Sequence, residues 1–263
     1  GPGKKGAIPP HTEPPPPKDD PQVAWRPRGR KQEAAMTCPA FECHMFGAKG
    51  GQKTESILLE GTRYAHLPGY RGLFLRRTLA SLDDAINRLH RYFGRLPEAT
   101  RPVWHAHDKV FRWPNPHTYT GAGGGEYAFA SVWAENELED YQREYHYVAI
   151  DQAEQWPLYW YEFLFAQVRN PPPGMPSPYM RSASNPGGIG TYWISQRFTT
   201  RIEKGLHPDA QPWPVYGPDP DTGETRFFFW RCAHRLEARD NPVIIDRDPG
   251  YRRRLASLTD PRI

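Results

Sequence analysis

Two short segments constrain most strongly what this chain can fold into: Gly47–Thr54 (GAKGGQKT) and Tyr145–Gln152 (YHYVAIDQ). The first segment follows a short apolar run, Phe41–Phe46, and precedes a stretch of helical composition, Glu55–Ala65. A glycine-rich turn that ends in Lys-Thr between a strand and a helix is typical of a phosphate-binding loop. Backbone N–H groups at the start of such a helix surround phosphate groups. The segment therefore predicts a nucleotide-binding α/β fold.

The loop residues have separate expected roles. We expect Lys53 to reach the β- and γ-phosphates and the hydroxyl of Thr54 to bind Mg²⁺. Gln52 stands where the standard pattern has its second glycine, and its side chain can crowd the phosphate there. A glycine-rich turn without a ligand is the alternative. The expected nucleotide contacts from the motif itself are Gly47, Gly50, Gly51, Gln52, Lys53 and Thr54.

The second segment reads as a strand that ends in a carboxylate. Tyr145–Ile150 is rich in β-branched and aromatic residues, and Asp151 follows it. A carboxylate at this position, facing a phosphate loop, binds Mg²⁺ in folds of this kind. The alternative is an Asp that only begins a turn or caps a helix. We predict Thr54 and Asp151 as the metal ligands.

Gln152 occupies the position where many such ATPases carry the glutamate that activates water. A Gln side chain has the same shape but accepts no proton at neutral pH. One explanation is a Glu-to-Gln substitution that traps bound nucleotide, and the Gly1–Pro2 start, typical of a cleaved expression tag, favours it. The other explanation is a natural variant in which Glu154 helps.

The order of elements predicts the fold class. Apolar strand candidates alternate with helical stretches, which favours an α/β architecture: a P-loop NTPase of the ASCE type with a mostly parallel sheet and helices on both faces. The Pro-rich stretches Pro171–Pro178 and Pro208–Pro220 are expected to be loops. The strand candidates are Phe41–Phe46, Leu73–Arg77, Val110–Trp113, Tyr145–Ile150 and Tyr179–Ser184, and the helical ones are Glu55–Ala65, Leu82–Phe93 and Trp156–Val168.

Composition sets the domain boundaries and the broad class. Residues 1–24 are rich in Pro, Lys and Asp, so we expect a disordered tail, followed by one ATPase domain over residues 25–263. The net charge of +4 permits a nucleic-acid partner without demonstrating one. No stretch approaches the ~20 apolar residues that span a membrane. Cys38, Cys43 and Cys232 lack Cys-x-x-Cys spacing, so we expect reduced cytoplasmic thiols with neither a zinc site nor a disulfide.

Several segments in order, from about Arg28 to the end of the chain, resemble the ATPase domain of the large terminase subunit of tailed bacteriophages. The last of them, with its Asp-Asn-Pro sequence, is the most specific to that family. The matching segments are RGRKQEAAM (Arg28–Met36), the loop itself, LFLRRT (Leu73–Thr78), FRWPNPHTYTGAG (Phe111–Gly123), YQREYHYVAIDQAEQW (Tyr141–Trp156), SASNPGG (Ser182–Gly188) and ARDNPVIIDRDPGYRRRLASL (Ala238–Leu258).

The resemblance implies further roles for single residues. Gln32 would read the edge of the adenine base, and Lys49 would touch the γ-phosphate. Gln152 would occupy the catalytic position, and Asn185 would hold the attacking water or couple hydrolysis to motion. Arg143 would serve as an arginine finger that reaches a neighbouring subunit, with Arg76 and Arg77 as rivals.

The resemblance also implies an activity and partners. The chain would bind ATP and Mg²⁺ and drive packaging of duplex DNA into a procapsid, as part of a homo-oligomeric ring that works with the portal and the small terminase subunit in the host cytoplasm. No membrane is involved. The nuclease domain that follows in the family is absent from this sequence, so we expect the chain to end at a domain boundary. Two alternatives stay open: a helicase-like ATPase that acts on nucleic acid, and a non-catalytic nucleotide-binding module that only assembles.

Overall fold

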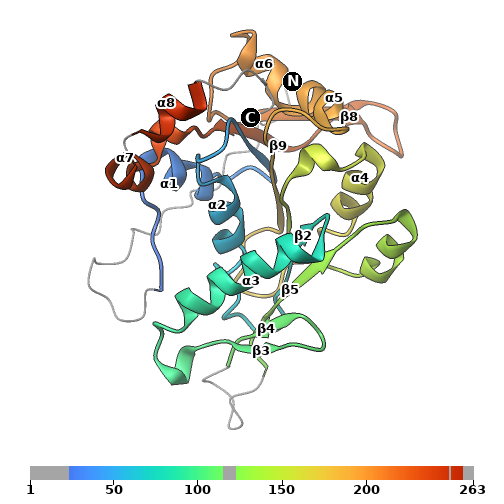
Figure 1. Cartoon of the computed structure of the whole chain (residues 1–263). Coiled ribbons are helices and arrows are strands. Elements are labelled where there is room, and N and C mark those ends of the chain that lie inside the picture. Colours follow the sequence, from blue (N-terminus) through green and yellow to red (C-terminus); the bar gives the residue numbers. More distant parts are fainter. Residues whose placement is uncertain (1–23, 115–122, 249, 257–263) are drawn as a thin grey trace.

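The computed structural model describes residues 24–114, 123–248 and 250–256 (Figure 1). Within these residues, nine strands form a single sheet. The strands are β1 (Glu42–Phe46), β2 (Arg71–Arg76), β3 (Val103–His105), β4 (Val110–Arg112), β5 (Glu126–Ser131), β6 (Tyr147–Ile150), β7 (Tyr179–Ala183), β8 (Trp213–Pro218) and β9 (Thr225–Arg235).

The sheet is parallel in its centre and antiparallel at both edges. Its strand order is β3-β4-β5-β2-β6-β7-β1-β9-β8. The six strands from β5 to β9 in this order run parallel to one another. The pairs β3–β4, β4–β5 and β8–β9 are antiparallel. This confirms the mostly parallel sheet predicted from the sequence.

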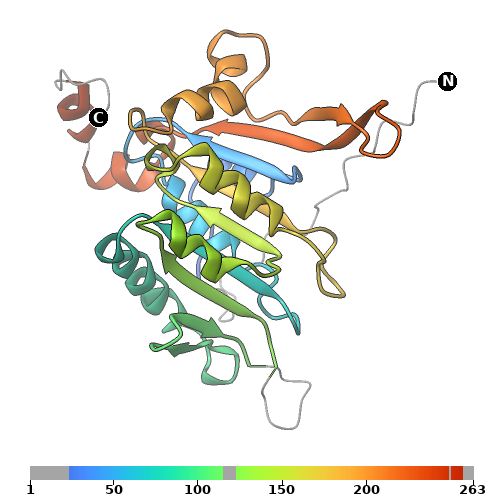
Figure 2. The same ribbon diagram turned by 90° about the vertical axis from the view of Figure 1, so that its right-hand side faces the viewer.

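Helices cover both faces of the sheet (Figures 1 and 2). Helices α1, α2 and α3 pack on one face, and α4 and α5 pack on the other. The bounds are α1 (Arg30–Met36), α2 (Lys53–Glu60), α3 (Leu79–Phe93), α4 (Leu158–Ala166), α5 (Thr191–Ile194), α6 (Thr200–Glu203), α7 (Pro242–Arg247) and α8 (Tyr251–Ala256), with a π-helical turn, Ser195–Thr199, joining α5 to α6.

Alternate residues of each central strand enter different cores. In β2, Phe74 packs with α1, α2 and α3, whereas Leu73 and Leu75 pack with α4 and α5. All three side chains are fully buried. Successive side chains of a strand point to opposite faces, so a strand covered on both sides must be apolar throughout. This is why LFL reads as a continuous apolar run.

The five predicted strands are present, with ends moved by one or two residues. The predicted helices shift more, and local chemistry explains the shifts. Helix α3 begins earlier than expected because the hydroxyl of Thr78 caps it, accepting from Ser81 N at 3.3 Å. Helix α2 ends at Gly61, where a Cβ would lie 2.4 Å from the Tyr127 ring. Pro157 is the N-cap of α4 and not part of its first turn.

The prediction of a loop over Pro208–Pro220 is wrong. Strand β8 lies there and pairs with β9 at the edge of the sheet. An edge strand tolerates proline because its outward N–H groups need no partner in the sheet, and Pro214 and Pro218 both lie in β8. Strands β3, β5 and β9 were also missed by the sequence analysis. Pro171–Pro178 contains no helix or strand, as predicted.

Two other predictions meet the limits of the described residues. The tail prediction covers residues 1–24, of which 1–23 lie outside the description; Ala24 packs, half-buried, against the core of α1 to α3. The paired strands implied for Phe111–Gly123 are not found as such, because β4 pairs with β3 and β5. Residues 115–122 of that segment lie outside the description. Among the described helices, none has the length and apolar character to cross a membrane.

Candidate nucleotide site

The loop Gly47–Gln52 joins β1 to α2 at the carboxyl edge of the parallel strands. Gly47 and Gly51 lie against the chain that leaves β9. A Cβ on Gly47 would lie 2.5 Å from Leu236 O, and one on Gly51 would lie 2.2 Å from the same atom. The glycines are therefore required for the loop to pack under Leu236.

Gln52 adopts the left-handed backbone conformation that favours glycine, with φ 61° and ψ 17°. This conformation costs a residue with a Cβ roughly 1–2 kcal/mol. The Nε2 atom of Gln52 is also buried without a hydrogen-bond partner among the described residues. The standard glycine of the motif would avoid both costs, so the departure at position 52 is a real strain in the loop.

Lys53 is buried inside the loop that it closes. Its Nζ donates hydrogen bonds to Gly47 O at 2.8 Å and to Ala48 O at 2.7 Å. Burial lowers the pKa of Lys53 to about 8, while the nearby carboxylates of Asp151 and Glu154 act in the opposite direction. A phosphate anion at this place would stabilise the charged ammonium further.

Thr54 and Asp151 meet across the site, as the sequence predicted. The Thr54 hydroxyl donates to Asp151 Oδ2 at 2.9 Å. Asp151 is buried at the end of β6, and Arg76 at the end of β2 pairs with the same carboxylate, Nε to Oδ2 at 2.8 Å. A hydroxyl and a carboxylate brought together are the oxygen donors that Mg²⁺ prefers. These two residues therefore fit the metal that such a loop requires.

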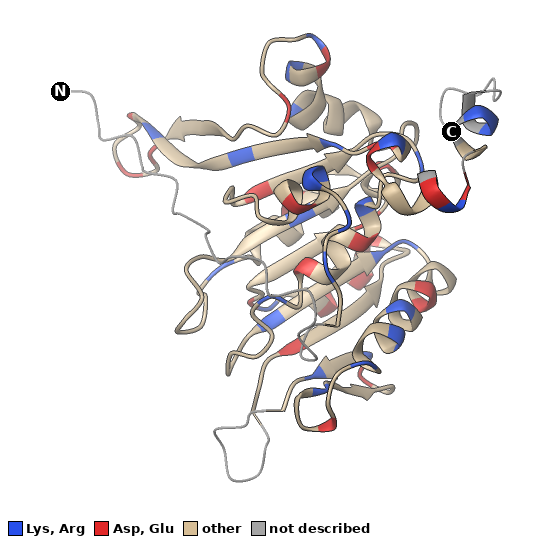
Figure 3. Ribbon diagram, turned by 90° about the vertical axis from the view of Figure 1, so that its left-hand side faces the viewer, with Lys and Arg blue, Asp and Glu red and all other residues tan. Residues whose placement is uncertain are grey.

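A cavity of about 550 Å³ opens beside the loop. Its wall includes Lys49 to Thr54, Asp151 and Asn185, together with residues of α3 and α7. Figure 3 shows Lys and Arg side chains on α3, from which Arg88 and Arg91 reach the cavity. Lys49, Lys53, Arg28, Arg88 and Arg91 outnumber the acidic groups Glu55, Asp84 and Asp151 on this wall. The excess of positive charge suits an anionic ligand.

Asn241, in the Asp-Asn-Pro segment, ties the end of the described chain to the loop. Its Oδ1 accepts from Val243 N at 3.1 Å and from Ile244 N at 3.4 Å, which caps α7. Its Nδ2 donates to Gly50 O at 2.9 Å. One buried side chain thus both begins α7 and fixes the phosphate loop.

His44 supports the site from below and was treated in the sequence only as a packed strand residue. Its ring lies between Ser182 and Ser184, with Nδ1 2.7 Å and Nε2 2.8 Å from the two hydroxyls. Burial, and then the charge of Lys53, lower the pKa of His44 to about 3. A neutral imidazole therefore links β1 to the Ser182–Gly188 segment. Nothing in the sequence pattern identified this link.

The position after Asp151 and its surroundings determine which group can accept a proton. Gln152 takes the left-handed conformation, φ 55°, and caps a short 3-10 turn. Glu154, in that turn, is buried, and its Oε1 accepts from Asn185 Nδ2 at 3.4 Å. Its Oε2 has no hydrogen-bond partner among the described residues. Burial raises the pKa of Glu154 to about 7, and the charge of Asp151 adds to the rise.

Two predicted site residues do not line the cavity. Gln32 is buried between helices, where its Oε1 accepts from Arg28 N and its Nε2 donates to Ser56 Oγ at 3.1 Å. Its amide is therefore already satisfied within the protein. Arg143 lies before β6, at the opposite end of that strand from Asp151, and its Nε donates to the Tyr145 hydroxyl. A strand advances about 3.3 Å per residue, so Arg143 cannot reach the cavity of its own chain.

Comparisons with known proteins find no match in sequence. No family profile matches this chain, and no curated protein matches it. Solved structures do match. The large terminase of a thermophilic bacteriophage has a TM-score of 0.60 at 11% identity over 89% of this chain, and the same protein in complex with ATP-gamma-S gives the same values. The large terminase ATPase domain of Thermus phage P74-26, in mutant form, has a TM-score of 0.59 at 17% identity over 91% of this chain.

The lengths of the matched chains differ. The described chain spans 52% and 50% of the two full-length large terminases, but 92% of the isolated ATPase domain. The likeness therefore concerns the ATPase part of those proteins. At these identities it establishes the fold, and the resemblance inferred from the ordered motifs is confirmed at that level. The chain has the fold of the ATPase domain of phage large terminases.

Proposed function

We propose that this chain binds ATP with Mg²⁺ and hydrolyses it as the motor domain of a viral DNA-packaging machine. The observation that carries the proposal is the meeting of Lys53, Thr54 and Asp151 at one sheet edge, beside a cavity with a basic wall. These are the three side chains that phosphoryl-transfer sites of this kind require.

Phosphate binding would exchange partners of Lys53. In the described structure its ammonium group is held by two loop carbonyls. The β- and γ-phosphates would take their place, with the loop N–H groups and the start of α2 completing the contacts. Lys49, exposed at the tip of the loop, would meet the γ-phosphate from outside. Arg28 and Tyr92 on the far wall would contact the nucleoside.

Thr54 and Asp151 would hold Mg²⁺ between the loop and β6. When bound, the ion neutralises charge on the phosphate oxygens. The Thr54 hydroxyl would turn its lone pair toward the ion and release its hydrogen bond to Asp151. Arg76, paired with Asp151 in the described structure, would keep that carboxylate oriented.

Hydrolysis needs a group that accepts a proton from the attacking water as the bond between the β-γ bridging oxygen and the γ-phosphorus breaks. Gln152 cannot accept it. Glu154 can, because its raised pKa of about 7 places it near the operating pH and its Oε2 is free of partners among the described residues. Asn185, which lines the cavity and donates to Glu154, would hold the water. The proton would pass to Glu154, and ADP and phosphate would leave.

The packaging role adds partners to this chemistry. Duplex DNA, the portal of a procapsid and the small terminase subunit would be the partners of a homo-oligomeric ring in the host cytoplasm. Arg143 is exposed on the chain, so it would act on the cavity of a neighbouring subunit. Arg76 would remain with Asp151 of its own chain.

The test compares phosphate release by the original chain with release by Gln152→Glu and Glu154→Gln, each with ATP, Mg²⁺ and duplex DNA. We expect release from the original chain and a loss of about 100-fold or more in Glu154→Gln, the usual contribution of a general base. Release only from Gln152→Glu would identify a trapped form and contradict the role of Glu154. Stimulation by single strands in preference to duplex would favour a helicase-like enzyme instead.

A further inference from the structure

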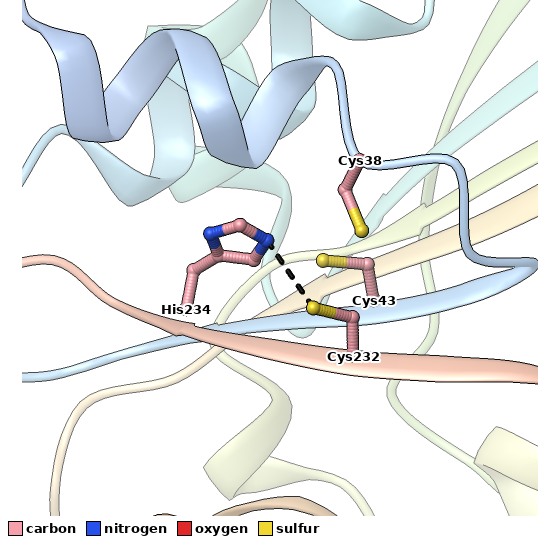
Figure 4. Close-up of side chains that lie close together, drawn as sticks. All are labelled: Cys38, Cys43, Cys232 and His234. Carbon is pink, nitrogen blue, oxygen red and sulfur yellow. Dashed lines mark hydrogen bonds between the residues drawn. The ribbon is translucent and has the colours of Figure 1, made fainter. Parts of the chain in front are cut away.

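Four side chains that bind soft metals lie together on the face of the sheet covered by α1 (Figure 4). They are Cys38, Cys43, Cys232 and His234, and all four are buried. One potential ligand atom from each lies within 4.8 Å of the corresponding atoms of the others. The nearest measured approach joins Cys232 Sγ and His234 Nε2 at 3.4 Å.

The sheet register brings two of the thiols together. Cys43 in β1 pairs with Cys232 in β9, and Met45 pairs with His234. Residues two apart on a strand share a face, so Cys232 and His234 both point to the side of Cys43. The pairing of two parallel strands therefore places three of the four ligands.

Arg181 fixes the fourth. Its guanidinium is buried, and it donates to Cys38 O at 2.7 Å and to Ala40 O at 3.0 Å. The linker between α1 and β1 is thereby held against the sheet with the Cys38 thiol over the other two (Figure 4). The cluster is built before any ion arrives, so binding would order little additional chain.

We propose that Cys38, Cys43, Cys232 and His234 bind a structural Zn²⁺ ion. Three thiolates and one imidazole are a recognised structural donor set for zinc. A tetrahedral site with bonds of about 2.3 Å places its ligand atoms about 3.8 Å apart. The present spacing requires a contraction of about 1 Å at most. With all four positions supplied by buried protein groups, the ion would have no open position for catalysis.

Charge and protons balance without a further reactant. Three thiol protons would leave to solvent as three Zn–S bonds form, and His234 would bind as neutral imidazole. The resulting site carries one net negative charge. Arg181 and Arg63 both interact with the single buried carboxylate Glu60 beside it. The surplus positive charge of that group would offset the charge of the site.

The ion would join three segments that the chain keeps far apart. It would fasten the Cys38 linker and β1 to β9, and the ends of β1 and β9 continue into Gly47 and Leu236 of the nucleotide site. The sequence analysis expected no zinc site, because Cys-x-x-x-x-Cys and a distant Cys-x-His match no common spacing. Only the pairing of β1 with β9 unites them.

The first test measures metal in the whole chain, purified without chelator from zinc-supplemented medium. We expect close to one zinc per chain by elemental analysis. Replacement by Co²⁺ should then give the visible bands of tetrahedral cobalt with a thiolate charge-transfer band in the near ultraviolet. Zinc far below one per chain, together with no tetrahedral cobalt spectrum, overturns the proposal. A missing pair of thiols in the denatured, unreduced chain also overturns it, since that result identifies a disulfide.

Variants separate the ligands from the packing. Cys232→Ser should lower zinc affinity by more than the ~10–100-fold that removal of a supporting group already costs. Ala233→Ser is the matched control: it adds the same hydroxyl one residue along β9, on the opposite face, and should keep its zinc. Equal zinc content in both variants contradicts the assignment. Neither assay uses nucleotide, so its result is independent of the proposed ATPase activity.

Discussion

The two ends of β1 offer two kinds of site. Its carboxyl end continues into the phosphate loop, where glycines, Lys53 and Thr54 follow one another along the chain. Its middle carries Cys43, whose partners come from a linker and from β9. The first site is written in consecutive residues because a helix start binds phosphate with local backbone groups. The second depends on strand pairing, so its parts are scattered through the sequence.

Both regions are also supported differently. The phosphate loop rests on contacts from late in the chain, above all Leu236 and Asn241. The thiol cluster rests on the buried Arg181–Glu60 ion pair beneath it. Substitutions in the supports should therefore separate the two regions more cleanly than substitutions in the sites themselves.

The largest effect is expected from Arg181→Met. It leaves the carboxylate of Glu60 buried without its partner, which typically costs about 3–5 kcal/mol of unfolding free energy. It also releases the carbonyls of Cys38 and Ala40. Urea unfolding measures the loss. The double variant with Glu60→Gln should recover much of it, and failure to recover would show that the ion pair is not the cause.

Acid should act through His44. Its folded pKa of about 3 lies below the ordinary 6.5, so between these values the unfolded chain binds a proton that the folded chain does not. Its contribution to stability is therefore complete above pH 6.5 and is lost as the pH falls, by up to about 1.4 kcal/mol per pH unit. His44→Asn should flatten the pH dependence of the unfolding free energy below pH 6.5. An unchanged slope in the variant would exclude His44 as the source.

Asn241→Ala should weaken the nucleotide side alone. It removes the cap of α7 and the hydrogen bond to Gly50 O, which together are worth about 1–2 kcal/mol. We expect weaker ATP binding by calorimetry with unchanged zinc content. Loss of zinc in this variant would mean that the two regions are not independent.

The smallest effect is expected from Gln52→Gly. Removing the Cβ relieves the left-handed backbone and the unpaired Nε2. The unfolding free energy should rise by roughly 1 kcal/mol, and ATP should bind at least as tightly. Lower stability would show that the Gln52 side chain makes a favourable contact that outweighs the strain.

The sequence predicted the parts of this molecule whose physics is local. Alternation of apolar runs and helices identified the central strands, and the Lys-Thr and Asp residues of the site meet as expected. It missed β8 because Pro214 and Pro218 suggested a loop, which only an edge position permits. It also missed the role of His44 between two serines and the thiol cluster, since both depend on which strands are neighbours.

Assignments of single residues fared unevenly. Thr54, Asp151, Lys49 and Asn185 lie at the cavity, but Gln32 and Arg143 do not. Motif order places a residue on an element without saying which way its side chain points. Gln32 turns inward because Ser56 and Arg28 N satisfy its amide.

The most direct measurement is a calorimetric titration of the chain with ATP and Mg²⁺, repeated on Lys53→Ala and on Lys204→Ala, an exposed lysine away from the site. The account predicts binding near one ATP per chain, retained in Lys204→Ala and weakened at least about 100-fold in Lys53→Ala, because the buried ammonium is the main charge for the phosphates. Equal binding by all three proteins, or no binding by any, would contradict the assignment of the phosphate loop.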